Sequence, residues 1–274
     1  MQPRRPDRQF NRDGDMITAK SNQHLKRIGQ LLRKRSAREE EQAFVIEGRK
    51  MFFELLRDYP ELLQRAFFSE SGLAGLSEQE RALACSYPYD IVRDDVFASV
   101  AETVTPQGVM AIVSMPKRQL SDLTAAGKGI LLLETLQDPG NLGTMIRTAE
   151  AADMGGILLS HDSVDAFSPK VVRATMGAIL RVPFVYASDF PKAVEALKEQ
   201  GYTVFAAHLK GSVPYDEADY GRKHAIMIGN EGNGLTEEAA SLADYRVRIP
   251  MAGQAESLNA AVAAAILMYE AGKC

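Results

Sequence analysis

Apolar residues in the second half of the chain come in short continuous runs. These runs stand at 130–136, 156–160, 181–186, 203–209, 225–229 and 245–250. Stretches with helical periodicity separate most of them, at 141–153, 168–179, 190–200, 235–243 and 256–271. A strand buried on both faces is apolar throughout, and strands that alternate with helices are typical of a parallel sheet covered on both sides. The pattern therefore predicts an α/β domain built on a parallel sheet.

The first half of the chain also alternates between helical and extended patterns. A helix is predicted at 21–42, where Leu25, Ile28, Leu31 and Leu32 form one apolar face. Strands are predicted at 43–48, 65–69, 89–92 and 108–115, and helices near 49–58 and at 94–101. The stretch 116–129 contains a proline, two glycines and little periodicity, as linkers do.

These patterns predict four regions. They are a polar, disordered arm at 1–15, a small α/β domain at 16–115, a linker at 116–128 and the parallel-sheet domain at 129–274. No apolar run reaches 18 residues, and residues 1–15 lack the apolar core of a secretory signal. The two cysteines, Cys85 and Cys274, and the four histidines show no metal-ligand spacing. We therefore expect a cytoplasmic protein without a metal and without a membrane segment.

The net charge of −4 conceals an uneven distribution. Residues 1–50 carry 13 Lys and Arg against 7 Asp and Glu, a net charge of +6, so the remaining residues sum to −10. A basic N-terminal segment on an acidic body is compatible with a polyanionic partner such as a nucleic acid. A solvated helix face is the simpler interpretation, and charge alone does not separate the two.

The first loop of interest is "QDPGNLGTMIR" (137–147), between an apolar run and a helix. Its glycines permit backbone shapes closed to other residues. We expect Asn141 or Thr144 to cap the helix, which leaves backbone N–H groups free to meet an anion. Arg147 then lies near the helix start, where the helix dipole disfavours a cation. A phosphate contact would explain this placement; a glycine-rich turn with a solvated arginine is the alternative.

The second loop is "IGNEGNGL" (228–235), which follows the apolar run "AIMI". Three glycines in six residues would let a flat ligand approach the main chain closely. The loop lacks the Gly-Lys-Ser/Thr of a phosphate-binding Walker loop, and its glycine spacing is the reverse of the dinucleotide-binding fingerprint. Glu231 is either an ordinary charge before a helix or a carboxylate of a site.

The third loop lies in "RIPMAGQAESLNAAVAAAILMYE" (248–270). An extended segment ends at Pro250, and Ser257 is expected to cap the helix that follows. Asn259 has poor helix propensity, so its amide is a candidate for a role outside the helix. The small residues of "AAVAAA" allow close packing against another element. An ordinary capped core helix is the alternative.

Together, the three loops resemble the ordered motifs of the SpoU (TrmH-type) family of RNA ribose 2'-O-methyltransferases, in the SPOUT class. The first motif resembles Asn141-Leu142-Gly143 with Arg147, the second "MIGNEGNGL" and the third "IPMAGQAESLNAAVAAAI". "SPKVVRATMGAI" (168–179) is similar to a segment usually found between the first and second motifs. "SNQHLKRIGQLLRKRSAREEEQAFVIEG" and "VTPQGVMAIV" resemble the small substrate-binding domain of many members. The resemblance covers roughly residues 16–272.

This resemblance implies a fold that the pattern alone does not. The C-terminal parallel-sheet domain would contain a deep trefoil knot, an exception to the usual rule against knots. A small N-terminal α/β domain would bind substrate, and the protein would be a homodimer with its site at or near the subunit interface. The implied cofactor is S-adenosyl-L-methionine.

The implied activity is S-adenosylmethionine-dependent 2'-O-methylation of a ribose in RNA. Ribosomal RNA is the first expectation, because the attached N-terminal domain more often accompanies rRNA enzymes in this family, and tRNA is the second. The alternatives are a tRNA ribose methyltransferase, methylation of a base by the same scaffold, and a non-catalytic RNA-binding or ribosome-assembly protein on the same fold.

The resemblance also assigns residues to roles. The catalytic candidates are Asn141, Arg147, Glu231, Ser257 and Asn259. The cofactor-binding candidates are Ala207, His208, Leu209, Gly229, Asn230, Gly232, Ile249, Met251 and Leu258. The RNA-binding candidates are Arg33, Lys34 and Arg35. Arg147 is expected to hold a phosphate and stabilise the developing alkoxide rather than act as a base, because a guanidinium does not deprotonate in proteins. A phosphate oxygen or Glu231 is the expected proton acceptor.

Overall fold

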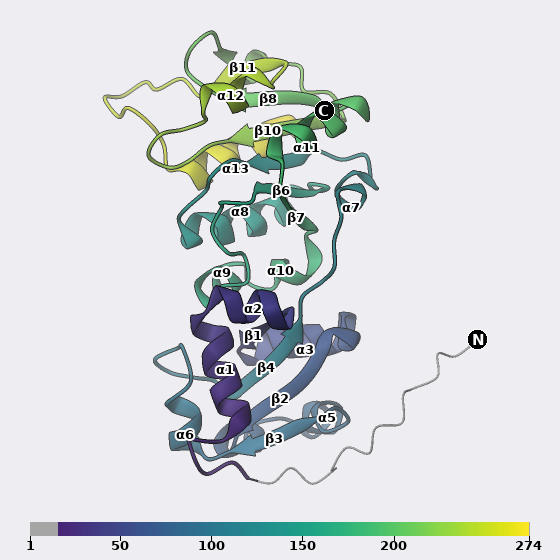
Figure 1. Cartoon of the computed structure of the whole chain (residues 1–274), viewed down its shortest axis with the longest axis vertical. Helices are drawn as coiled ribbons and strands as arrows, with labels where there is room; N and C mark the ends of the chain where they lie inside the picture. Colours follow the sequence, from purple (N-terminus) through teal and green to yellow (C-terminus); the bar gives the residue numbers. More distant parts are fainter. Residues whose placement is uncertain (1–15, 274) are drawn as a thin grey trace, which may run out of the picture. The chain divides into compact units, whose positions relative to one another are not determined.

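The computed structural model describes residues 16–273 and divides into two compact units between Met115 and Pro116. Figure 1 shows the elements of both units along the chain. The arm predicted at 1–15 lies outside the described residues, as does Cys274.

The first unit is built on a four-stranded mixed sheet with the strand order β1-β4-β2-β3. Strand β4 is antiparallel to both of its neighbours, whereas β2 and β3 run parallel. The strands are β1 (Ala43–Glu47), β2 (Leu63–Ser69), β3 (Tyr89–Val92) and β4 (Val109–Ser114). The helices are α1 (Gln23–Arg33), α2 (Arg35–Glu41), α3 (Arg49–Asp58), η1 (Pro60–Leu62), α4 (Glu70–Ala74), α5 (Glu78–Ala84) and α6 (Asp94–Ala98).

The single helix expected at 21–42 is two helices in the structure. Lys34 between them has an extended backbone, and its N–H bonds back to the carbonyl of Gln30 as α1 ends. The guanidinium of Arg38, which is buried, donates hydrogen bonds to the carbonyls of Leu31 and Leu32. The last turn of a helix leaves carbonyls without intrahelical partners. Arg38 of α2 therefore supplies hydrogen bonds to the end of α1, which periodicity could not reveal.

The second unit contains a seven-stranded sheet in which every paired strand runs parallel, in the order β7-β6-β5-β10-β8-β11-β9. The strands are β5 (Ile130–Leu133), β6 (Gly156–Ser160), β7 (Phe184–Ala187), β8 (Thr203–Ala207), β9 (Val213–Pro214), β10 (His224–Ile228) and β11 (Tyr245–Arg248). The helices are α7 (Leu120–Thr124), α8 (Pro139–Ala151), α9 (Pro169–Ala174), α10 (Ala178–Arg181), α11 (Phe190–Glu199), η2 (Tyr215–Glu217), α12 (Glu237–Ser241) and α13 (Ala260–Ala271). The parallel sheet expected from the apolar runs is therefore present.

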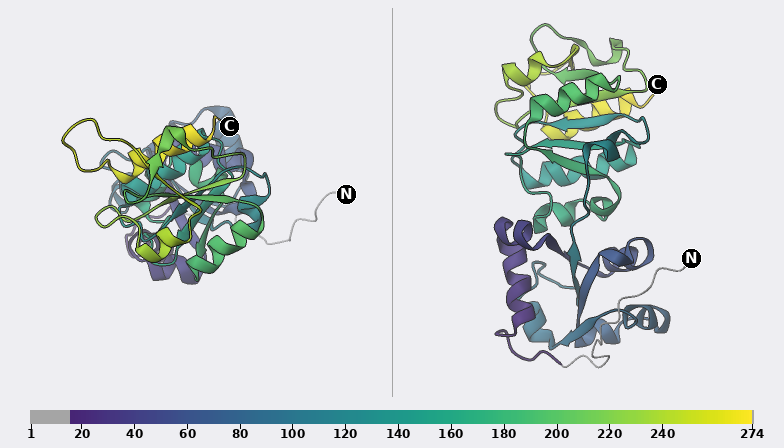
Figure 2. Two further views of the ribbon diagram at one scale, coloured as in Figure 1. Left: turned by 90° about the horizontal axis from the view of Figure 1, so that it is seen from above. Right: turned by 45° about the vertical axis from the view of Figure 1, so that its right-hand side comes forward.

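Helices cover both faces of this sheet, as the right-hand view of Figure 2 shows. On one face, Leu123 of α7, Val194 and Leu197 of α11, and Ala240 of α12 share a core cluster with residues from the strands. On the other, α8 and α13 pack against each other and against β6 and β10. Strands buried from both sides account for the continuous apolar runs in the sequence.

Two predicted segments differ in detail from the structure. The stretch expected to be a linker at 116–128 contains α7, whose Leu123 is fully buried in the second unit. The helix expected at 168–179 is divided into α9 and α10 by Met176 and Gly177, which have positive φ values of 52° and 96°. Met176 is a non-glycine residue in the left-handed region, and that conformation ends a helix.

Strands β5 and β10 are neighbours at the point where the connections of this sheet diverge. From β5 the chain continues to β6 and β7 on one side, whereas from β10 it continues across β8 to β11 on the other. In open parallel sheets, ligands bind beyond the carboxyl ends of the strands at such a switch point. The fold therefore directs attention to the loops after Leu133 and Ile228. The trefoil knot stays a prediction.

Candidate active site

Glu231 holds the loops after β5 and β10 together. One carboxylate oxygen accepts a hydrogen bond from the backbone N–H of Gln137 at 3.0 Å. The other accepts from the N–H of Asp138 at 2.8 Å and from the side-chain amide of Asn141 at 3.0 Å. These donors lie just before or within the first turn of α8, where free N–H groups and the helix dipole favour a negative charge. The carboxylate thus fixes the shape of the first candidate loop.

The third loop joins this network through Asn259. Its side-chain amide donates to the side-chain oxygen of Asn141 at 2.9 Å, and Asn141 is only 9% exposed. The side-chain oxygen of Asn259 in turn accepts from the N–H groups of Ala261 and Val262 at the start of α13. Residues 118 positions apart are therefore in direct contact, and the Glu231–Asn141–Asn259 network links all three candidate loops.

Both helix caps expected from the sequence are wrong. Asp138, not Asn141 or Thr144, caps α8, and its carboxylate accepts from the N–H of Asn141 at 2.8 Å. Asn259, not Ser257, caps α13. The physical reason is that the Asn141 side chain is already bonded to two other loops and is not available to cap its own helix. Ser257 lies two residues before the observed cap.

Thr135 is part of the site although the sequence did not point to it. It has a φ of 52°, which is uncommon for a β-branched residue and costs about 1–3 kcal/mol. All its polar groups are bonded: its N–H to the Ser160 hydroxyl at 2.8 Å, its hydroxyl to Asp162 at 2.9 Å, and its carbonyl to the Asn230 amide at 2.9 Å. These bonds hold the strained turn that leads from β5 into the candidate loop.

Asp162, Ser160 and Gln137 were also missed. The Ser160 hydroxyl bonds to Asp162, and the Gln137 amide donates to the carbonyls of Thr135 and Asp162. The signal was present in the sequence, because Ser160 and Asp162 stand at the end of the apolar run 156–160. In a parallel sheet that run ends at the same edge as the run that leads to the first loop.

Hydrogen bonding lowers the pKa of two of these carboxyl groups. Burial raises the pKa of Glu231, but the bonds from Asn141, Asp138 and Gln137 outweigh this effect and leave the pKa below the ordinary value of 4.5. For Asp162, the bond from Ser160 is the largest influence and lowers the pKa; burial opposes it and the bond from Thr135 adds to it. Both groups are therefore carboxylates at neutral pH, and the network depends on that charge.

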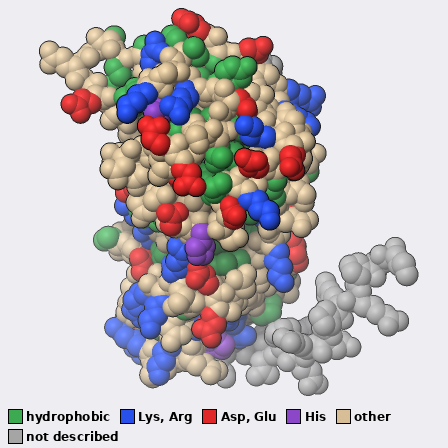
Figure 3. Space-filling model, turned by 45° about the horizontal axis from the view of Figure 1, so that its top comes forward, with side chains coloured by type: hydrophobic (Ala, Val, Ile, Leu, Met, Phe, Trp, Pro, Cys, Tyr) green, Lys and Arg blue, Asp and Glu red, His purple; other side chains and the backbone are tan. Residues whose placement is uncertain are grey.

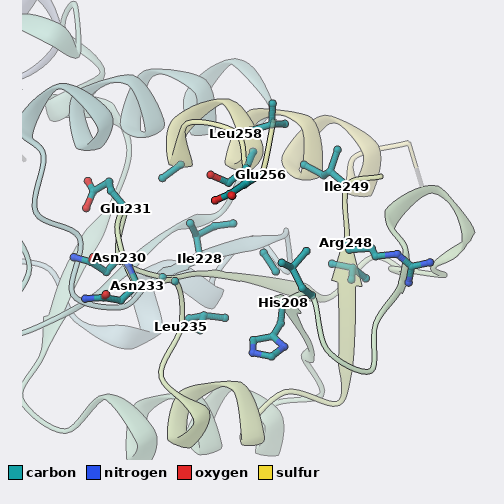
Figure 4. Close-up of a pocket in the computed structure, with 18 of the residues that line it drawn as sticks. His208, Ile228, Asn230, Glu231, Asn233, Leu235, Arg248, Ile249, Glu256 and Leu258 are labelled. Atoms are coloured by element: carbon teal, nitrogen blue, oxygen red, sulfur yellow. Dashed lines mark hydrogen bonds between the residues drawn. The ribbon is translucent and has the colours of Figure 1, made fainter. Parts of the chain in front are cut away.

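A cavity of about 430 Å³ opens beside Glu231 and is shown in Figure 4. The nine cofactor-binding candidates all line it: Ala207, His208, Leu209, Gly229, Asn230, Gly232, Ile249, Met251 and Leu258. Glu231 and Ser257 line it as well. Its volume lies in the range of small-molecule sites. Gly229 is required by chain packing, since a Cβ there would stand 2.2 Å from the backbone of Gly234 and Leu235.

Arg147 is not part of this cavity or of the network. It lies on the exposed arc of α8 with Thr144 and Ala151, whereas Asn141 faces inward. Its charge acts on Glu150, whose pKa is raised by burial and lowered by Arg147. The structure thus brings Asn141, Glu231 and Asn259 together and leaves Arg147 on the outer surface of the same helix.

The three RNA-binding candidates lie in the first unit, at the junction of α1 and α2. Arg35 forms an ion pair with Glu39 at 2.6 Å. Arg33 and Lys34 form no ion pair or side-chain hydrogen bond within residues 16–273. In the part of the chain that the structure describes, no group of three or more His, Cys, Asp or Glu residues could hold a metal ion. None of the described helices is long and apolar enough to cross a membrane.

Comparison with known proteins matches both units. Residues 128–269 match the model of the SpoU rRNA Methylase family, and residues 22–111 match an MRM3-like substrate binding domain. The chain is 35% identical over 253 residues to the 23S rRNA (guanosine(2553)-2'-O)-methyltransferase RlmP of Bacillus subtilis (strain 168), which covers 92% of this chain and 97% of the relative.

Solved structures give the same result. An AdoMet-bound rRNA methyltransferase from Sinorhizobium meliloti superimposes with a TM-score of 0.84 at 32% identity, covering 94% of this chain and 97% of that one. The SpoU methyltransferase AviRb from Streptomyces viridochromogenes, in complex with AdoMet, has a TM-score of 0.81 at 25% identity, covering 92% and 98%. The match along the whole chain, with the three loops converging at a parallel-sheet switch point, places this protein in the SpoU RNA methyltransferase family, with an N-terminal substrate-binding domain.

Proposed function

We propose that this protein transfers a methyl group from S-adenosylmethionine to the 2'-oxygen of a ribose in ribosomal RNA. The observation that carries the proposal is the Glu231–Asn141–Asn259 network, which ties the three family loops around one cavity. The name of the Bacillus relative supports rRNA over tRNA as the substrate. A cytoplasmic location, where such a substrate is found, is part of the proposal.

The cavity suits S-adenosylmethionine. Leu235, Ile249 and Leu258 provide apolar walls for a flat base, next to main-chain groups of the loops. The carboxylates of Glu231 and Glu256 line the same cavity and favour a ligand that carries positive charge. When bound, S-adenosylmethionine supplies an electrophilic methyl group on a sulfonium. The chain's part is to position this group and the ribose for an in-line approach.

Glu231 positions the loops and does not take the proton. A general base needs a free acceptor position aimed at the proton that it takes. The two carboxylate oxygens of Glu231 instead accept three hydrogen bonds from its own chain. This leaves a phosphate oxygen of the RNA as the candidate acceptor. The hydrogen bond between the side chains of Asn141 and Asn259 holds the first loop next to the start of α13.

The active form is a homodimer. Arg147 lies on the surface of α8, so in this arrangement it acts on the cavity of the partner subunit. Val262 and Tyr269, both exposed and apolar, lie two turns apart on α13, which packs beside α8. A second copy docked on this face would cover them and bring Arg147 to the cavity of the partner subunit. There the guanidinium would grip the phosphate beside the ribose and stabilise the developing alkoxide. Ser257, at the cavity wall, would contact the ribose or the cofactor.

Mixed dimers test this arrangement. Arg147→Ala and Asn259→Ala chains are each expected to be inactive alone. If Arg147 serves the partner's cavity, a dimer of one chain of each kind has one intact site, and co-expression restores part of the methyl transfer. If Arg147 serves its own cavity, no intact site forms and no activity returns.

The activity itself is tested with purified protein, S-adenosylmethionine carrying an isotopic methyl group, and separate rRNA and tRNA substrates. Nuclease digestion and mass spectrometry then identify the methylated nucleoside. We expect a 2'-O-methyl nucleoside in rRNA. A methylated base would contradict the ribose assignment, and product in tRNA alone would contradict the substrate assignment. No product with either RNA would favour the non-catalytic alternative.

A further inference from the structure

Three basic side chains, two of them in the loop after β8, surround one carboxylate. The Oε1 atom of Glu237 lies 3.9 Å from Nε2 of His208 and 3.9 Å from Nζ of Lys210, and its Oε2 atom lies 3.8 Å from Nη2 of Arg246. We name these four residues the rim cluster. Figure 3 shows basic, acidic and histidine side chains close together on the upper part of the face that it displays.

The rim cluster is loosely held. All three distances exceed hydrogen-bond length, so the contacts are electrostatic only. Lys210 is 84% exposed and Glu237 is 69% exposed, and exposed pairs of this kind contribute little to stability. Two permanent positive charges therefore face one negative charge, in a unit whose Asp and Glu residues outnumber its Lys and Arg residues. Fold stability does not explain why these cations gather here.

Two members of the rim cluster, His208 and Lys210, also line the cavity. Glu231 lines the same cavity, and Figure 4 shows His208 and Arg248 on the side away from Glu231. Arg246 donates to the carbonyl of Lys210 at 3.4 Å, and Arg248 donates to the carbonyl of Ser212. The loop after β8 is thus held by side chains of β11, with its basic groups converging on one point.

We propose that the rim cluster binds a backbone phosphate of the substrate RNA, close to the nucleotide that enters the cavity, and that Glu237 occupies the phosphate's place in the free protein. This inference rests on the proposed function. A phosphate offers more acceptor oxygens than a carboxylate and forms charge-assisted hydrogen bonds with Lys and Arg. Glu237 sits in the five-residue helix α12 with its side chain exposed, so it can move aside for the incoming anion.

Two substitutions with opposite expected effects on RNA affinity test the proposal in the full-length protein. Lys210→Gln removes a phosphate contact, so it should weaken RNA binding and reduce the slope of log K against log salt by about 0.7, the value for one contact to a single strand. Glu237→Gln removes the competing charge and should tighten RNA binding. Lys192→Gln, an exposed lysine on α11 with no ion pair among the described residues, is the matched control and should leave both quantities unchanged.

The probe is the rRNA fragment that the wild-type protein methylates, titrated by fluorescence anisotropy at several salt concentrations, with cofactor affinity measured in parallel by calorimetry. Equal RNA affinity in wild type, Lys210→Gln and Glu237→Gln would overturn the proposal. A loss of cofactor affinity with RNA affinity unchanged would also overturn it, because the anion would then be the cofactor's carboxylate. Methylation by the wild-type protein is measured first, so a failure of the proposed function is distinguished from a failure of the rim cluster.

Discussion

Two groups of polar side chains at the same edge of the second unit are organised in opposite ways. In the Glu231–Asn141–Asn259 network, the bonds measure 2.8–3.0 Å and the donors and acceptors are bonded to one another. In the rim cluster, the charges stand 3.8–3.9 Å apart and none is hydrogen-bonded to Glu237. The first group uses its polar atoms to hold the loops together, whereas the second, as we propose, uses its charge to bind a phosphate. Substitutions in the network should therefore lower stability, whereas substitutions in the rim cluster should change RNA affinity.

The largest effect is expected at Arg147, which belongs to neither group. Arg147→Ala should lower the rate of methyl transfer by about 10²–10³-fold or more, as removal of an oxyanion-stabilising group does. Cofactor affinity should stay within about tenfold, roughly 1.4 kcal/mol, because Arg147 does not line the cavity. Arg147→Lys should fail as well if two-pronged phosphate contact matters. A collapse of cofactor affinity, measured by calorimetry, would assign Arg147 a structural role instead.

Asn141→Ala should be the next most damaging change and should act through the loops. It removes one bond to Glu231 and leaves the Asn259 amide without its partner, at a cost of about 1–3 kcal/mol of unfolding free energy. Denaturant unfolding measures this loss, and activity should fall with it. Asn233→Ala changes an asparagine of the neighbouring loop whose side chain forms no hydrogen bond within residues 16–273, and it should leave the unfolding free energy nearly unchanged. Equal effects at both positions would contradict the network.

The charge of Glu231 predicts a dependence on pH. Its pKa is lower in the folded than in the unfolded chain, so its contribution to stability is fully present above the ordinary value of 4.5 and is lost as pH falls below it. The difference in unfolding free energy between wild type and Glu231→Gln should therefore shrink on acidification. Thermal unfolding of both proteins across the acidic range is the measurement. A difference that grows as pH falls would show that the carboxylate is not stabilised by the fold.

The smallest effect is expected in the first unit, among Arg33, Lys34 and Arg35. Here too, some charged side chains have an ion-pair partner and others do not. Arg35 is paired with Glu39, whereas Lys34 has no side-chain partner among the described residues. Lys34→Gln should weaken RNA binding by a few-fold and lower its salt dependence, and Arg35→Gln should do so less. Anisotropy titrations with the same RNA distinguish them. A larger loss at Arg35 would contradict the idea that unpaired charge marks the RNA-facing surface.

Six of the seven strands of the second unit were predictable, because each lies in an apolar run, whereas the two-residue strand β9 is not buried on both faces and left no such run. The ends of the helices and the breaks within them were less predictable. The extended Lys34 and the left-handed Met176 interrupt helices whose periodicity continues through them. The break after α1 is satisfied by Arg38, a residue that a pattern of hydrophobicity treats as surface, although it is buried.

The candidate site was predictable to the extent that its residues recur in family order. The nine cofactor-binding candidates came from that resemblance, and they line one cavity. Thr135 and Asp162 were not predicted, because their importance lies in one strained turn and the groups that bond it. The roles of Asn141 and Ser257 as helix caps were predicted wrongly, because local propensity does not include a partner 118 residues away.

The sequence by itself determined the succession of strands and helices and the three loops that carry chemistry, since burial and backbone freedom leave a local imprint on residue type. Only the tertiary structure decided which polar groups are used up and which remain available. The fold brings the N–H of Asp138 within 3 Å of the Glu231 carboxylate, so this carboxylate is hydrogen-bonded to its own chain. It leaves Nζ of Lys210 near 4 Å from the Glu237 carboxylate, so this ammonium group is not hydrogen-bonded to it. Hydrogen-bond strength changes steeply over that interval, and no order of residues along a chain specifies it.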